Sequence, residues 1–276
     1  MKSTSTTERP IDSSQLGRMQ RMLERCAQLT QSIGKIPAVA TPDWCERSSA
    51  ALASVFTHAD LAIILADVAE SGRVNEVLSI GACAVRHGKL ERQEGLDLRV
   101  RFEGMVGLPW SPDGMTIQDG SDVASKTYGR TELINTSHAN TWYIPANGSL
   151  IATAALLCPQ SRVRKLLTYV ALPESTERSF ECMMVVRLAS ALLARVAHVA
   201  MGAGPGAILW LTHREQEVLD LLVMGNSVKE VSETLGRSPH TIHDHVKSLH
   251  RKLNANSRGE LVAKALGHIP ATQPSN

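Results

Sequence analysis

The sequence predicts an α+β N-terminal domain, in which helices bracket an antiparallel sheet, followed by an all-α domain of four helices. In the N-terminal part, two pairs of short apolar runs have the length of strands. Segments on either side of them carry apolar residues at steps of three and four, which is the spacing of helices. The C-terminal part carries four separate helix-start signals.

The composition is that of a globular chain with two domains. The length is 276 residues, and one domain commonly takes about 100–200 residues. Apolar residues make up 43%, charged residues 20%, and the formal net charge is +2, so we expect any basic surface to be local. The five cysteines form no CxxC pair, which argues against a disulfide framework and a zinc finger and favours reduced core thiols.

The sequence shows no targeting or membrane-spanning pattern. No apolar run follows the first lysine, and no window holds eighteen uninterrupted apolar residues. We therefore expect a cytoplasmic protein that does not contact a membrane.

The clearest domain boundary is GAGPGA, residues 202–207, where glycines and a proline separate two helical patterns. We predict five parts from this boundary and from the patterns around it. They are an N-terminal segment with an amphipathic helix (1–39), the α+β domain (40–201), a linker (202–207), the four-helix domain (208–270) and a disordered tail (271–276).

Two helices are expected before the sheet. The first carries one apolar stripe and ends at Gly34. The second follows Thr41 as a cap, with Pro42 at its first helical position, and runs to about residue 57. The stripe of the first helix, which we expect to lie in the core rather than at a dimer interface, consists of Leu16, Met19, Leu23, Cys26, Leu29 and Ile33.

Two strand hairpins and a long helix complete the predicted N-terminal domain. Residues 61–65 and 77–85 form the first hairpin, and residues 149–157 and 165–172 form the second. Residues 103–148 are rich in Gly, Pro, Asp, Ser and Asn, and we expect loops and short elements there, at the rim of a pocket. The last helix, which runs to Met201, is predicted to bury Met184, Val185, Leu188, Leu192, Val196 and Val199.

This order of elements resembles a GAF-type or PAS-type sensor domain. The resemblance implies that the domain senses a signal or forms a dimer. An alternative is a divergent receiver domain with Asp67 as its phosphate acceptor. The receiver domain requires alternating strands and helices, whereas residues 77–85 follow as a second strand, so we favour the sensor domain.

The four C-terminal helices are predicted from their ends. Thr212 with Glu215, Ser227 with Glu230 and Ser257 with Glu260 have the spacing of capping boxes. Ser238 before Pro239 gives the remaining start. Gly225, Gly236 and Asn254 with Asn256 end the first three helices. The second and third helices form a helix-turn-helix, whose apolar seam is Val231, Leu235, Ile242, Val246, Leu249 and Leu253.

The strings LTHREQEVLDLL and GNSVKEVSETLGRSPHTIHDHVKSLHRKLNANSRGELVAKAL resemble the LuxR/NarL-type (GerE-like) helix-turn-helix of bacterial transcription regulators. The resemblance runs from about Trp210 to Leu266. It implies that the third helix enters the major groove of DNA and that the last helix often pairs two copies.

The outward face of the third helix shows His240, His243, Asp244, Lys247 and Arg251. By position we assign His243, Asp244 and Lys247 to DNA bases. The family commonly has a lysine at the position of His243 and a small or apolar residue at that of Asp244, so the target sequence is open. Phosphate contacts are assigned to Lys229, Arg237, Ser238, Thr241, Arg251 and Arg258.

A second interpretation of the histidines is a metal site. His245 points about 160° away from His243 by helical rotation, which argues against a shared metal. We expect His245 to pack and bond to backbone, and we expect His250 and Lys264 to lie at the surface.

The sequence therefore predicts a transcription regulator that binds double-stranded DNA as a homodimer and receives a small-molecule or protein signal at its N-terminal domain. No metal, no cofactor and no catalytic residue is expected, because GxSxG, P-loop, HExxH and GxGxxG patterns are all missing. Two alternatives stay open: a catalytic N-terminal domain tethered to DNA, and an N-terminal domain that only binds another protein.

Overall fold

The computed structural model describes residues 13–107, 110, 116–117, 123–127, 149–157, 163–173, 179–201 and 208–269. The elements, in order, are α1 (Ser13–Ile33), α2 (Trp44–Ala53), β1 (Ala59–Val68), β2 (Val74–Arg86), β3 (Lys89–Glu91), α3 (Arg92–Glu103), β4 (Thr116–Ile117), β5 (Val123–Thr127), β6 (Ser149–Leu156), β7 (Arg164–Leu172), α4 (Ser179–Met201), α5 (His213–Val223), α6 (Val228–Leu235), α7 (Pro239–Lys252) and α8 (Arg258–Ala265). The predicted linker and tail lie outside the described residues.

The N-terminal part is built on an antiparallel sheet with helices, as predicted. Within the described residues the strand order is β3-β2-β1-β7-β6-β5-β4. Both predicted hairpins, β1–β2 and β6–β7, are present and antiparallel, and β1 pairs with β7 between them. Asp67 lies in β1 and pairs with Arg164 at 3.2 Å. These antiparallel neighbours do not fit the receiver-domain alternative.

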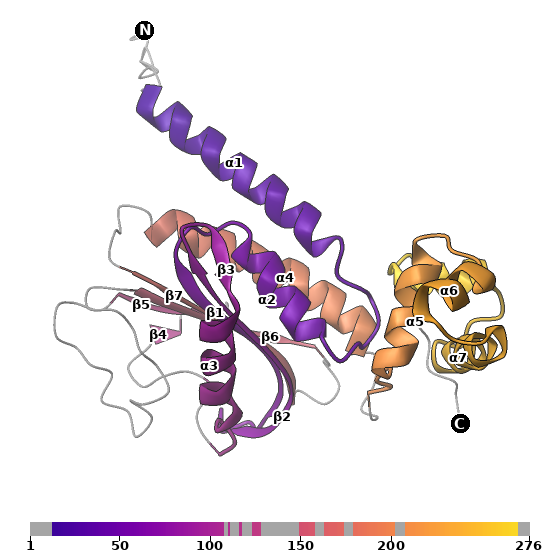
Figure 1. The fold of residues 1–276 in the computed structure, drawn as a ribbon. Coiled ribbons are helices and arrows are strands. Elements are labelled where there is room, and N and C mark those ends of the chain that lie inside the picture. The colour runs from indigo at the N-terminus through magenta and orange to yellow at the C-terminus, as the bar shows by residue number, and fades with distance from the viewer. Residues whose placement is uncertain are drawn as a thin grey trace, which may run out of the picture.

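The sheet separates two apolar clusters because side chains alternate across it. On one face, Leu61, Ile63 and Leu65 of β1 join residues of α1, α2 and α4 in the larger cluster. On the other face, Ile64 joins Phe102 of α3, and the ring of Phe102 stacks on Tyr169 with 5.5 Å between ring centroids. Figure 1 shows α2 and α4 on one side of the sheet and α3 on the other.

The predicted stripe of α1 is only partly correct. Leu29 and Ile33 are buried in the larger cluster, whereas Leu16, Met19 and Leu23 are exposed. Figure 1 shows the reason: the N-terminal half of α1 extends past the other elements of its domain. The C-terminal half is held by Arg25 and Gln28, whose side chains donate to the carbonyl oxygens of Val55 and Ser54.

The predicted face of α4 is shifted. Val185 is buried as expected, but Met184 is 42% exposed. Leu188, Leu192, Val196 and Val199 are partly buried, and the fully buried positions are Val185, Val186, Ala189, Leu193 and Ala197. Both faces of α4 are apolar, so the spacing of apolar residues could not show which face packs on the sheet.

By length and hydropathy α4 is the one helix of the described chain that could span a membrane, from Glu181 to Met201. Its buried side chains pack in the larger cluster with residues of α1, α2 and the sheet.

Other parts of the N-terminal domain differ from the sequence prediction. α2 begins at Trp44 with Asp43 as its N-cap and ends at Ala53, so Pro42 lies outside the helix. β3 and α3 were not predicted, because α3 has no apolar stripe that marks a helix. Trp110, which falls in the segment 103–148, is buried in the smaller apolar cluster with Phe102 and Tyr169.

The four predicted C-terminal helices are all present. Both halves of the capping box form at Thr212 and Ser227. Ser238 accepts from Thr241 N with Pro239 in the first turn. At α8 only half of the predicted capping box forms. The Ser257 hydroxyl accepts from Glu260 N, but the Glu260 carboxylate accepts from Asn256 N instead of the amide of Ser257. Gly236 ends α6 with φ of 61°, the left-handed conformation that suits glycine.

Candidate nucleic-acid interface

α7 is fixed to its domain along one face and open to solvent along the other. Ile242 and Leu249 are fully buried in the cluster that also holds Val231 of α6, and Leu235 and Val246 pack at its edge. Ser232, a small residue of α6, is also buried. The predicted seam is therefore confirmed, and α7 presents the opposite face outward.

The residues assigned to bases lie together on that outward face. His243, Asp244 and Lys247 are all exposed, and the side chain of Lys247 is 77% accessible. The Asp244 carboxylate lies 3.7 Å from the Lys247 ammonium and 3.7 Å from Nε2 of His240, one turn earlier. The Lys247 ammonium therefore partly offsets the negative charge of Asp244, at a separation where such pairs are weak.

The residues assigned to phosphates surround this face. Lys229, Arg237, Ser238, Thr241 and Arg251 are exposed. The hydroxyls of Ser238 and Thr241 are 2.9 Å apart at the start of α7, where free amide hydrogens favour an anion. Arg258 is also exposed, but unlike the other assigned residues its guanidinium donates to the carbonyl oxygen of a neighbouring loop residue, Asn226, at 2.6 Å. That bond leaves Arg258 other donors for a phosphate.

A hollow of about 260 Å³ lies between α5, α6 and α7. Arg237 and Thr241, both assigned to phosphates, line it together with His245. His245 is half-buried there, as expected of a packing residue, and its bond to backbone stays a prediction. Arg214 also lines the hollow and pairs with Glu217 at 2.7 Å.

An ion pair between a buried carboxylate and Lys252, which the sequence did not predict, fixes the end of α7. Glu215 is 3% exposed and accepts from Lys252 at 2.7 Å and from the Ser248 hydroxyl at 2.6 Å. Burial acts to raise the pKa of Glu215, but these donors and the amide of Thr212 outweigh it and lower that pKa to about 2. Glu215, recognised only as a capping residue, thus ties α5 to α7.

Two residues expected at the surface are instead structural. Lys264 is 3% exposed, pairs with Glu260 at 2.8 Å and donates to the carbonyl oxygen of Asn254. His250 is half-buried, with Nδ1 2.7 Å from the carbonyl oxygen of Ala255. A charged or polar side chain can be buried when it meets such partners. Among the described residues, His, Cys, Asp and Glu form no group of three that could hold a metal ion.

The sequence of this four-helix part matches known proteins. Residues 209–265 match the family described as bacterial regulatory proteins, luxR family. The chain is 36% identical over 56 residues to the spore germination protein GerE of Bacillus subtilis, covering 20% of this chain and 76% of GerE. The chain belongs to the luxR family. The residues that match the luxR family form helices α5 to α8, and they include the outward face of α7.

Other comparisons cover the luxR-family part or resemble the whole chain only weakly. The transcriptional regulatory protein MctR of Rhizobium johnstonii is 43% identical over 58 residues, which span 21% of this chain and 27% of MctR. The chain thus matches about a quarter of the length of MctR. The crystal structure of Escherichia coli SdiA aligns over 91% of this chain and 98% of SdiA at 14% identity, with a TM-score of 0.33. A TM-score this low does not establish a shared fold.

Proposed function

We propose that the protein is a cytoplasmic transcription regulator that binds specific double-stranded DNA as a homodimer. The observation that carries the proposal is the outward face of α7, where an exposed lysine and histidines project from a helix fixed by buried apolar residues. Membership of the luxR family supports it. The family and MctR are both described as regulatory proteins, and we expect neither catalytic activity nor a cofactor.

In this proposal α7 lies in the major groove. His243, Asp244 and Lys247 contact base edges, where histidine and lysine donate to guanine and aspartate accepts from cytosine. Lys229, Arg237, Ser238, Thr241, Arg251 and Arg258 contact phosphates and set the register. Two copies of α7 then read half-sites about one helical turn apart, roughly 10 base pairs.

We propose that the N-terminal domain is a GAF- or PAS-type domain that receives a small-molecule or protein signal or pairs two copies. Its antiparallel sheet with helices is consistent with such a domain. The domain limits stated from the sequence, 40–201 and 208–270, stay predictions. No observation favours a catalytic N-terminal domain over this proposal.

Selection of bound sequences from a random pool of duplex DNA by the full chain tests the proposal. We expect enrichment of a motif with two related half-sites about 10 base pairs apart. On the selected DNA, Lys247→Ala should weaken binding by about tenfold, because it removes one proposed base contact. Lys89→Ala, which removes an exposed lysine of β3 far from α7 in the chain, is the matched control. An unenriched pool, or equal effects of both substitutions, contradicts the proposed function.

A further inference from the structure

The segment that connects α1 to α2, residues 34–43, is buried to an extent that is unusual for a connection. Such segments ordinarily run over the surface. Here Ala38, Val39, Ala40 and Thr41 are all buried. We call residues 34–43 the α1–α2 segment.

Val39 of the α1–α2 segment lies inside the core of the luxR-family domain. It is 2% exposed and belongs to the apolar cluster of α5 to α8, together with Leu211, Leu222 and Leu261. No other member of that cluster comes from the N-terminal domain within the described residues. Removing an apolar side chain from water is favourable, so Val39 contributes to the interior of the luxR-family domain.

Two backbone hydrogen bonds flank Val39 and join the same two parts of the chain. The amide of Ala38 donates to the carbonyl oxygen of Ala265 at 2.9 Å, and the amide of Leu211 donates to the carbonyl oxygen of Ala40 at 2.9 Å. Ala265 is the last residue of α8, whose carbonyl has no partner within the helix. The α1–α2 segment therefore supplies the donor that ends α8.

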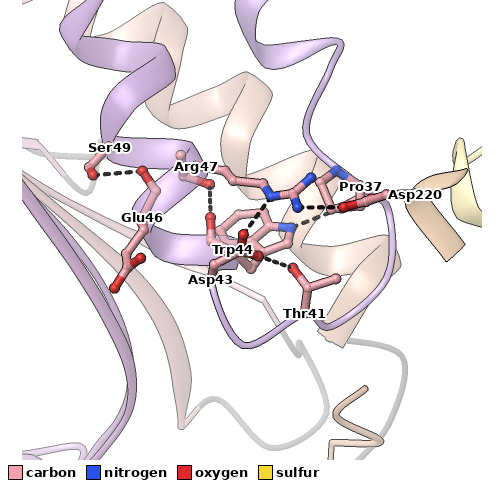
Figure 2. A network of polar contacts seen from close by, with 9 residues as sticks. Pro37, Thr41, Asp43, Trp44, Glu46, Arg47, Ser49 and Asp220 are labelled. Atoms are coloured by element: carbon pink, nitrogen blue, oxygen red, sulfur yellow. Dashed lines mark hydrogen bonds and ion pairs between the residues drawn. The ribbon is translucent and has the colours of Figure 1, made fainter. Parts of the chain in front are cut away.

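A polar network continues the contact from α2 to α5. Figure 2 shows Arg47 between two carboxylates: it donates to Asp43 at 2.8 Å and to Asp220 of α5 at 2.8 Å. Thr41 donates to Asp43 at 2.9 Å, and Trp44 Nε1 donates to the carbonyl oxygen of Pro37 at 2.9 Å. Burial acts to raise the pKa of Asp43, but bonds from Arg47, Gln216 of α5 and Thr41 leave that pKa below its usual value.

We propose that the α1–α2 segment, with Arg47, is a clamp through which the N-terminal domain holds the DNA-binding domain and sets the orientation of α7. The clamp contacts α5 and α8 and leaves the outward face of α7 exposed, so it positions that face without covering it. Because α1 is bonded to the end of α2 through Arg25 and Gln28, a displacement of α1 reaches α5 through ordered contacts. The part of the proposal that concerns α7 rests on the proposed function.

The contact offers a matched pair of glycine variants for its test. A Cβ built on Gly267 would lie 2.9 Å from Cβ of Ala38, so Gly267→Ala places a methyl group inside the clamp. Gly267 has φ of 75°, and the alanine is also strained there. Gly236 has φ of 61° with nothing within 4 Å of such a Cβ, so Gly236→Ala introduces the backbone strain alone.

The test is hydrogen exchange of the full chain without DNA, followed by mass spectrometry of peptides that contain residues 36–44. We expect Gly267→Ala to speed exchange in those peptides by about threefold or more, whereas Gly236→Ala leaves them unchanged. The prediction is specific, because both substitutions lie far along the chain in the other domain. Unchanged exchange at 36–44 in Gly267→Ala overturns the clamp.

A double-mutant cycle on Arg47→Ala and Asp220→Ala gives a second measurement that does not depend on a steric clash. We expect each single variant to speed exchange in both 36–44 and α5, and the double variant to fall short of the product of the two effects by about threefold. Arg214→Ala, which removes a pair within α5, is the control and should affect α5 alone. Independent, multiplicative effects contradict the clamp. Neither measurement uses DNA. Both therefore test the clamp even if the protein does not bind DNA as proposed.

Discussion

The ammonium of Lys252 lies 2.7 Å from the carboxylate of Glu215, and the pair joins the end of α7 to the start of α5. The side chain of Glu215 is 4% accessible and that of Lys252 is 22% accessible. The position of α7 therefore depends in part on a charge pair whose carboxylate is buried and whose ammonium is partly accessible.

Acid should destabilise the luxR-family domain through Glu215. The pKa of Glu215 is lowered to about 2 from its usual 4.5, so its stabilisation is present above pH 4.5 and is lost as pH falls toward 2. A shift of this size corresponds to about 3 kcal/mol. We expect urea unfolding of the wild type to show this loss between pH 5 and 2. Glu215→Gln should be less stable at pH 7 and lack this component of the pH dependence; a parallel profile would contradict the assignment.

Asp244→Asn should strengthen binding to unrelated DNA and weaken base discrimination. The carboxylate repels nearby phosphates, whereas it accepts from cytosine N4 at a matching base pair. We expect the preference for the selected base pair at one position to fall about tenfold, measured by fluorescence anisotropy on single-substituted sites. Glu233→Gln makes the same charge change on α6 and should leave base preference intact. Equal preferences in wild type and Asp244→Asn would remove Asp244 from the proposed base contacts.

Arg258→Ala should affect both folding and DNA binding. The lost bonds to the carbonyl oxygens of Asn226 and Leu222 should cost about 1 kcal/mol of unfolding free energy. If Arg258 also contacts a phosphate, the slope of log affinity against log salt falls by about one. Lys229→Ala should lower the slope equally without the loss of stability. An unchanged slope for Arg258→Ala would leave that arginine a structural role only.

Leu29→Ala and Leu23→Ala compare two leucines of α1. Leu29 is fully buried, and its truncation should cost about 2–5 kcal/mol in urea unfolding. Leu23 is 63% exposed, and its truncation should change stability by about 0.5 kcal/mol or less. A large loss for Leu23→Ala would mean that a second copy covers it, and that loss would then depend on protein concentration.

Local signals in the sequence predicted the luxR-family domain well. A cap acts on the amides two or three residues ahead, so Thr212, Ser227 and Ser238 could be identified without any knowledge of the rest of the fold. The outward face of α7 followed from the same local periodicity, since Ile242, Val246 and Leu249 form an apolar stripe on the opposite side.

Such local signals could not predict contacts between parts of the chain that are far apart in the sequence. The burial of Val39 depends on a domain that begins about 170 residues later, and nothing near Val39 indicates it. Lys264 is buried because Asn254 and Glu260 supply acceptors in three dimensions. On α1, one continuous stripe is covered at Leu29 and open at Leu16, because the extent of the neighbouring elements decides which half is packed.

The position of Val39 bears on how the protein can be divided. A truncated protein that starts at residue 208 keeps all four helices of the luxR-family domain but has an unfilled space among Leu211, Leu222 and Leu261. Such a fragment should melt at a lower temperature than the same domain within the full chain. A synthetic peptide of residues 34–44, added in excess, should fill that space and restore part of the lost melting temperature.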